Sequence, residues 1–178
     1  MNPLRLLSII TLLSFSGSMV NCGRQHTTNQ MNQSQPASRG VQPLYQMMLE
    51  WAVLNQQLPG RTSKIAFPDR NLIKDVPVIR VSSENVPSDV KLSLPNKQIQ
   101  ILSEEGLQKL ADETGDFLAF RFSELNLSDG SAELGLNLNW ILPKNSQKGV
   151  LSGGGTRILF RFQDGTWTFQ KQGGFWIP

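Results

Sequence analysis

The side chains best suited to nucleophilic or acid–base chemistry are scarce in this chain. Cys22 is its only thiol and His26 its only imidazole. His26 falls in residues 23–40, a stretch rich in Gln, Asn, Ser and Thr and nearly free of large apolar groups. Such a stretch cannot bury enough surface to fold, and a catalytic histidine must be held in place. We therefore predict no catalytic role for either residue.

A second group of polar side chains alternates with apolar ones in the latter half of the chain. We call it the polar side, and it consists of Arg121, Ser123, Glu133, Asn137, Asn139, Arg157 and Arg161. Arginine and asparagine can hold an anionic or sugar-like ligand through forked hydrogen bonds. The candidate ligand site is Arg121, Asn137, Asn139, Arg157 and Arg161. The alternative is that these residues form the solvent-exposed face of an antiparallel sheet, with Arg–Glu pairs across its strands.

Metal and cofactor motifs are not evident. The acidic residues of the middle region are Glu104, Glu105, Asp112, Glu113 and Asp116, and their spacing matches no calcium loop. A solvated helix surface explains them better. Gly153-Gly154-Gly155 lacks the Gly-Lys-Ser/Thr ending of a phosphate loop. We predict no metal and no cofactor, and an enzyme would have to use carboxylates alone.

Strands must position the polar side. Every even position from Ala132 to Leu142 is apolar, the period of a strand with one buried face. Shorter alternations occur at 118–122, 158–162 and 166–170, and Asp129-Gly130 and Asp164-Gly165 have the composition of hairpin turns. These strands are predicted to form an antiparallel meander with one apolar face. Further short strands are plausible at 78–81, 90–94 and 98–102.

Two helices are expected around that sheet. Pro43 suits a first turn, and one apolar stripe follows at helical spacing up to Pro59-Gly60: Leu44, Met47, Met48, Trp51, Leu54 and Leu58. This helix has the stripe needed to cover the meander. A shorter helix begins after Ser103, a good N-cap, and ends at Gly115, with residues 61–77 left as irregular loop. The predicted fold class is α+β: an N-terminal helix packed on a curved antiparallel meander, with a short second helix.

The first 22 residues have the features of an export signal. Arg5 gives a positive start, and residues 6–15 form an apolar run too short to span a bilayer. Small residues follow, and then Met19-Val20-Asn21-Cys22. This segment resembles a bacterial lipoprotein signal, which implies that Cys22 is lipidated and becomes the mature N-terminus. Asn21 departs from the family pattern, and cleavage after Ser18 is the alternative.

The order of helix and then meander is similar to that of cystatin-like and nuclear-transport-factor-like α+β rolls. Residues 98–178 also resemble small exported bacterial proteins of that shape, through Gly115-Asp116-Phe117-Leu118, residues 151–155 and Asp164-Gly165-Thr166-Trp167. Such rolls host both enzymes and binding modules, so the fold transfers no function. The predicted organisation is a signal at 1–22, a flexible tether at 23–40 and one domain at 41–178.

The net charge of the chain bears on which binding partners are expected. The formal net charge is +3, without a basic stripe, so nucleic acid is not expected. The sequence favours a non-catalytic, lipid-anchored accessory or ligand-binding protein of the cell envelope, facing the periplasm or the cell exterior. Its partners would be the membrane, through Cys22, and a small anionic or sugar-like ligand or an envelope protein. The alternatives are a protein-interaction module that docks through a sheet edge or the apolar tail 175–177, a carboxylate-only enzyme, and a secreted soluble protein.

Overall fold

The computed structural model describes residues 40–64, 66–149 and 152–176, all within one compact unit. The predicted signal, Cys22, His26 and the tether up to residue 39 lie outside the described residues. In chain order the elements are α1 (Gln42–Leu54), the 3₁₀ turn η1 (Arg70–Leu72), β1 (Val78–Ser82), β2 (Gln98–Leu102), α2 (Glu104–Thr114), β3 (Phe117–Phe122), β4 (Asn126–Ser128), β5 (Ser131–Ile141), β6 (Ser152–Gln163) and β7 (Thr166–Trp176).

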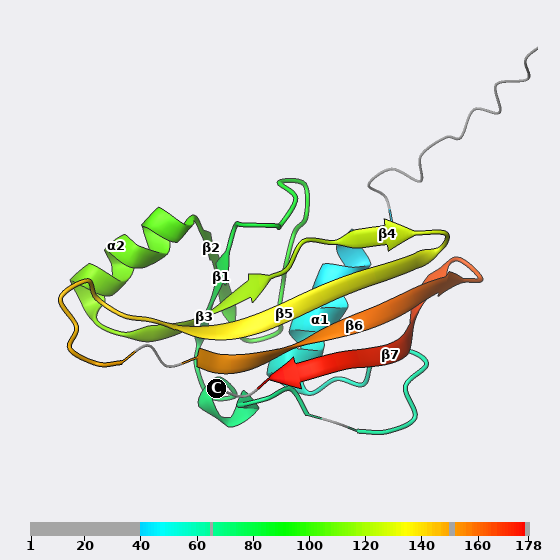
Figure 1. Ribbon diagram of the computed structural model, residues 1–178, viewed down its shortest axis with the longest axis horizontal. Coiled ribbons are helices and arrows are strands. Elements are labelled where there is room, and N and C mark those ends of the chain that lie inside the picture. The colour runs from blue at the N-terminus through cyan, green and yellow to red at the C-terminus, as the bar shows by residue number, and fades with distance from the viewer. Residues whose placement is uncertain (1–39, 65, 150–151, 177–178) are drawn as a thin grey trace, which may run out of the picture. The chain divides into compact units, whose positions relative to one another are not determined.

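The strands form a seven-stranded sheet in the order β2-β1-β3-β5-β6-β7, with β4 paired to β5 (Figure 1). The α+β class is confirmed, and β3, β5, β6 and β7 pair antiparallel as predicted. The sheet as a whole is mixed, because β1 runs parallel to both β2 and β3. The prediction of a wholly antiparallel sheet is therefore wrong at this end. β2 connects through α2 to β3 on the far side of β1, and such a crossover joins parallel strands.

Both predicted hairpin turns are present. Asp129 and Gly130 have φ angles of 39° and 73°, and Asp164 and Gly165 have φ angles of 51° and 79°. Two consecutive positive φ angles match the twist of the flanking strands, which is why these residue pairs favour tight hairpins.

The buried face of the sheet is the predicted one. Leu134, Leu136 and Leu138 are fully buried, in the same core as Leu44 and Met48 of α1. Figure 1 shows α1 crossing one face of the sheet behind β5 and β6. The helix is therefore the cover that the alternating leucines of β5 require.

The first helix differs from the prediction in its length and its surroundings. It begins at Gln42, so it is the first described element but not the start of the chain, and it ends at Leu54 because Asn55 adopts a left-handed conformation (φ 59°). Its far side is covered as well. The side-chain amide of Gln46 donates to Ser93 O (2.6 Å) and accepts from Ser93 N (3.1 Å), and Tyr45 Oη donates to Asn85 O (3.0 Å).

The second helix has the predicted ends. Ser103 Oγ accepts a hydrogen bond from Gly106 N (3.1 Å), and Gly115 follows the last residue of α2. The predicted strand at 90–94 is absent from the described sheet, where Leu94 makes only an isolated bridge with Lys97. Strand β7 continues to Trp176, so residues 175 and 176 of the predicted apolar tail belong to the sheet, opposite Thr156 and Gly155.

Candidate functional site

The polar side is not exposed along its whole length. At the α2 end, Leu107 and Ala111 of the helix bury Phe117, Ala119 and Ile141 in a second apolar cluster. The expectation of a sheet with a single apolar face is therefore wrong here, because α2 covers the opposite face from α1. Only the part of the polar side beyond α2 is open to solvent.

Arg121 is tied to α2. Its Nε and Nη2 donate to Glu104 Oε1 (2.8 Å) and Oε2 (2.6 Å), and the buried Ser82 Oγ donates to Glu104 Oε1 (2.6 Å). The hydrogen bonds from Arg121 lower the pKa of the Glu104 carboxyl and raise the pKa of Arg121. This cluster fastens the first turn of α2 to β1 and β3.

The other candidate ligand residues follow β5 and β6. Asn137 lies opposite Arg121, and Asn139 lies opposite Ala119. Arg157 Nη1 lies 3.6 Å from Glu133 Oε1. Arg161 is exposed, and its backbone pairs with Ser131 at the start of β5. Both Arg121 and Arg157 therefore face carboxylates. Asn137 Oδ1 is buried and has no hydrogen-bond partner among the described residues.

A more enclosed feature lies where β1 and β3 separate. These strands pair at only two positions, Arg80 with Ala119 and Val81 with Phe120. Before those positions the strands enclose a hollow of about 220 Å³, which we call the β1–β3 cleft. It is lined by Leu72, Ile73, Val76, Val78, Ile79, Arg80, Asp116, Phe117, Leu118, Phe120, Leu138 and Trp140.

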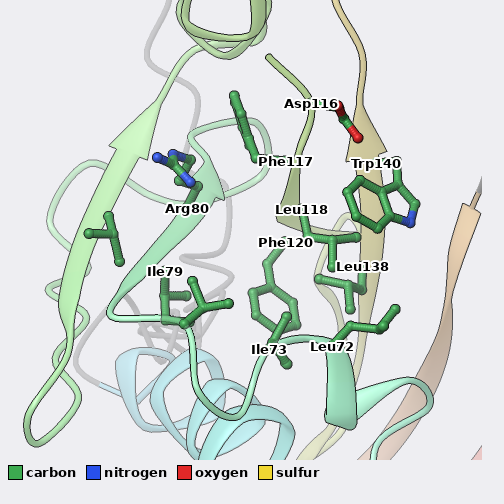
Figure 2. Close-up of a pocket in the computed structure, with 12 residues that line it drawn as sticks. Leu72, Ile73, Ile79, Arg80, Asp116, Phe117, Leu118, Phe120, Leu138 and Trp140 are labelled. Carbon is green, nitrogen blue, oxygen red and sulfur yellow. The ribbon is translucent and has the colours of Figure 1, made fainter. Parts of the chain in front are cut away.

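The cleft is apolar except for two charged residues. Figure 2 shows Arg80 beside Phe117 on one side and Asp116 near Trp140 on the other, with Leu72 and Ile73 at the opposite end of the view. The Arg80 guanidinium carbon lies 4.4 Å from the centroid of the Phe117 ring. This contact is a cation–π arrangement, which leaves the edge of the guanidinium able to donate.

The two charges of the cleft are not equivalent. Both carboxylate oxygens of Asp116 accept from Lys148 Nζ, at 2.9 and 3.0 Å, and these hydrogen bonds lower the pKa of Asp116. Arg80 has no ion pair with a described carboxylate, and its Nε is buried without a partner. The cleft thus combines apolar walls with one uncompensated positive charge.

A second uncompensated cation, Arg61, lies in the loop after α1. Arg61 is only 5 % exposed, and its guanidinium carbon lies 5.4 Å from the Trp51 ring and 4.9 Å from the Phe169 ring. Nη2 donates to Gln172 Oε1 (2.9 Å), while Nε and Nη1 lack acceptors among the described residues. Burial lowers the pKa of this group. The adjoining hollow of about 10 Å³ has room for little more than one water molecule.

Two other acidic residues of α2, Asp112 and Glu113, are exposed at the surface. Asp112 accepts from Gln108 and from the Lys144 backbone N–H, and Glu113 lies 3.9 Å from Lys109. Within the described ranges, no three His, Cys, Asp or Glu side chains come together as a metal site would require.

The sequence did not indicate the cleft. Arg80 is the only charged residue of β1. A single charge on the polar side of an alternating strand is common, so it does not indicate a site. The cleft depends on how far β1 and β3 stay paired, and that distance is set by packing between segments remote in sequence. Comparison with family models, curated proteins and solved structures gives no match. Across the part of the chain described above, no helix is long and apolar enough to cross a membrane.

Proposed function

We propose that this protein is a non-catalytic binding module of the cell envelope that takes a small apolar carboxylate in the β1–β3 cleft. The observation that carries the proposal is the buried, unpartnered Nε of Arg80 in a hollow whose other charged residue, Asp116, is already paired with Lys148. Arg80 is half-buried, and a cationic donor shielded from water is costly unless an anion or hydrogen-bond acceptor meets it; a carboxylate supplies both.

The size of the cleft limits its ligand. Its volume of about 220 Å³ is below the range of about 300–1,000 Å³ that is usual for drug-sized ligands. One short acyl chain or one aromatic ring suits such a space. The apolar walls would hold the hydrocarbon part, and Arg80 would orient the acid. Asp116 would not compete strongly for that guanidinium, because Lys148 already neutralises it.

The envelope location and the anchor belong to the same proposal. They are supported by the apolar run at 6–15 and by Cys22 after it, which is the arrangement of a lipoprotein signal. A non-catalytic role is supported by the lack of histidine and thiol in residues 41–178. A curved roll of the cystatin-like kind is supported by the packing of α1 on the antiparallel strands, although the parallel pair β1–β2 adds to that plan.

A second candidate site lies on the open part of the polar side. The buried Asn137 Oδ1 needs a donor, and a sugar hydroxyl would supply one beside Arg157. This candidate would bind a sugar-like ligand rather than an apolar acid.

A titration of the purified full-length chain separates the two sites. We expect calorimetry to show binding of octanoate and none of octylammonium, because the chains match and only the charge differs. Arg80→Gln should weaken octanoate binding about tenfold, which corresponds to about 1.4 kcal/mol. Arg157→Gln is the matched control and should leave the affinity unchanged. Equal binding by the Arg80→Gln variant, or loss with Arg157→Gln alone, would refute the cleft as the site.

A further inference from the structure

The two edge strands of the sheet, β7 and β2, differ in how far other segments cover them. On the outer side of β7, Phe169 N donates to Pro59 O (2.6 Å), and Gly60 packs against Thr168. That edge is therefore partly covered by the loop after α1. At the other edge, β2 has no further strand beside it in the described part of the chain.

The backbone of β2 presents hydrogen-bonding groups to the outside. Gln98 N donates to Pro77 O (3.0 Å), and Leu102 O accepts from Ser83 N (2.8 Å), so both residues turn their backbone groups toward β1. Backbone groups alternate in direction along a strand, which places Gln100 in the same set. Ile99 and Ile101 consequently turn their N–H and C=O groups to the free edge.

The side chains of β2 do not protect this edge. Sheet edges of soluble proteins are usually blunted by charges, proline or a bulge. The sequence of β2, QIQIL, contains neither charge nor proline, and its register with β1 is regular. Ile101 is 40 % exposed, and a hollow of about 360 Å³ lies between this strand and Leu110 of α2. The helix reaches β2 at Leu102, but its buried side packs mainly on β3 and β5, so Ile101 stays exposed.

We propose that β2 pairs antiparallel with β2 of a second copy, about a two-fold axis at Gln100. In this register Ile99 lies opposite Ile101 of the other copy, and the two exchange both N–H···O=C bonds. The two-fold axis generates a second such pair, so every outward N–H and C=O group of Ile99 and Ile101 is hydrogen-bonded. The same pairing sets isoleucine against isoleucine on the α1 face of the sheet, where such cross-strand contacts are favourable.

The charges at the ends of β2 favour a second copy in this orientation. Lys97 precedes the strand and has no carboxylate partner in the described ranges, although its Nζ donates to Lys74 O (2.9 Å) and Val76 O (2.7 Å); the exposed Glu105 lies in the first turn of α2 just after the strand. The antiparallel register brings Lys97 of each copy diagonally toward the acidic helix start of the other. A parallel pairing would instead set Lys97 against Lys97. An edge that is complementary to itself forms a closed dimer rather than an open chain.

Cysteine cross-linking tests the register in the full-length chain with Cys22→Ser as background. Gln100 would face itself across the axis in a non-hydrogen-bonded pair, with Cα atoms about 4.5 Å apart. That separation allows a disulfide, for which the Cα distance is about 4.4–6.8 Å. The matched control is Gln98, which has the same side chain on the same strand but would lie about 14 Å from its copy. We expect mild oxidation to cross-link the Gln100→Cys protein and not the Gln98→Cys protein.

Light scattering after gel filtration supplies the second measurement. The Cys22→Ser protein should be a dimer, and Ile101→Lys should make it a monomer with an unchanged circular dichroism spectrum. Ile101→Val should remain a dimer. A protein that is monomeric at every concentration would overturn the proposal. So would a monomer whose β2 edge pairs with a strand of another protein instead. Equal cross-linking at both positions, or a dimer that survives Ile101→Lys, would overturn it too.

Discussion

Arg61, Arg80 and Arg121 lie at least partly in the protein interior and have different partners. Arg121 has a carboxylate in a two-pronged geometry, Arg80 has one aromatic ring, and Arg61 has two rings and a glutamine. A guanidinium edge without an acceptor retains most of its desolvation cost. At the scale of single residues, Arg121 therefore stabilises the fold. Arg61 and Arg80 both keep donors without acceptors, and Arg80 is the one of the two that lines a hollow with room for a ligand.

The Glu104–Arg121 pair predicts how stability depends on pH. The pKa of Glu104 is lowered from its ordinary value of 4.5 by the hydrogen bond from Arg121. Its contribution is therefore present above pH 4.5 and is lost as the pH falls through the lower, folded-state pKa. Glu104→Gln should cost about 1 kcal/mol at pH 7, since the pair is partly exposed. It should also flatten the decline in stability below pH 4.5.

Urea unfolding at a series of pH values measures this effect. Glu105→Gln is the control, because it removes the same charge from the same helical turn without touching Arg121. Its curve should follow that of the parent protein at acid pH. If the Glu104→Gln curve also ran parallel to the parent below pH 4.5, the assigned role of the pair would be wrong.

At the scale of elements, the accuracy of sequence-based prediction followed the strength of local signals. The alternation in β5 and the caps of α2 are local, and both elements lie where the sequence predicted them. Leu58 continued the helical spacing, but Asn55 turns the chain out of the helix first. The second half of β7 contains glycines and glutamines, so apolar and polar side chains do not alternate there. It is a strand because it pairs with β6. The cleft was missed for the same reason, because the separation of β1 from β3 depends on packing.

Strand β6 passes close to the backbone of β5, and this proximity yields a steric prediction. A Cβ atom at Gly153 would lie 2.7 Å from Leu138 O and 3.1 Å from Leu138 Cγ, so Gly153→Ala must displace the neighbouring strand. We expect a loss of about 1–3 kcal/mol in the free energy of unfolding. Gly174→Ala on β7 is the matched control, since nothing lies within 4 Å of its added methyl. Similar urea midpoints for the two variants would show that β6 has more freedom than the packing indicates.

At the scale of the whole molecule, the proposed parts have separate tasks. The cleft lies between β1 and β3, and the proposed dimer edge lies on the outer side of β2. β1, β2 and α2 connect them, but the dimer register uses no residue that lines the cleft. Loss of the dimer through Ile101→Lys should therefore leave octanoate binding intact. The proposed anchor at Cys22 is a third part, separated from α1 by residues 23–41.

The anchor gives a prediction for location that is independent of the fold. Each buried CH₂ of an acyl chain contributes about 0.8 kcal/mol, so two or more chains on Cys22 would hold the protein stably in a membrane. We expect the parent protein in the membrane fraction, with a lipid-modified Cys22 as its first residue by mass spectrometry. Cys22→Ser should move it to the soluble fraction, and His26→Ser, a change in the predicted tether, should not. A mature chain that begins at Met19 would instead establish cleavage after Ser18 and an unanchored protein.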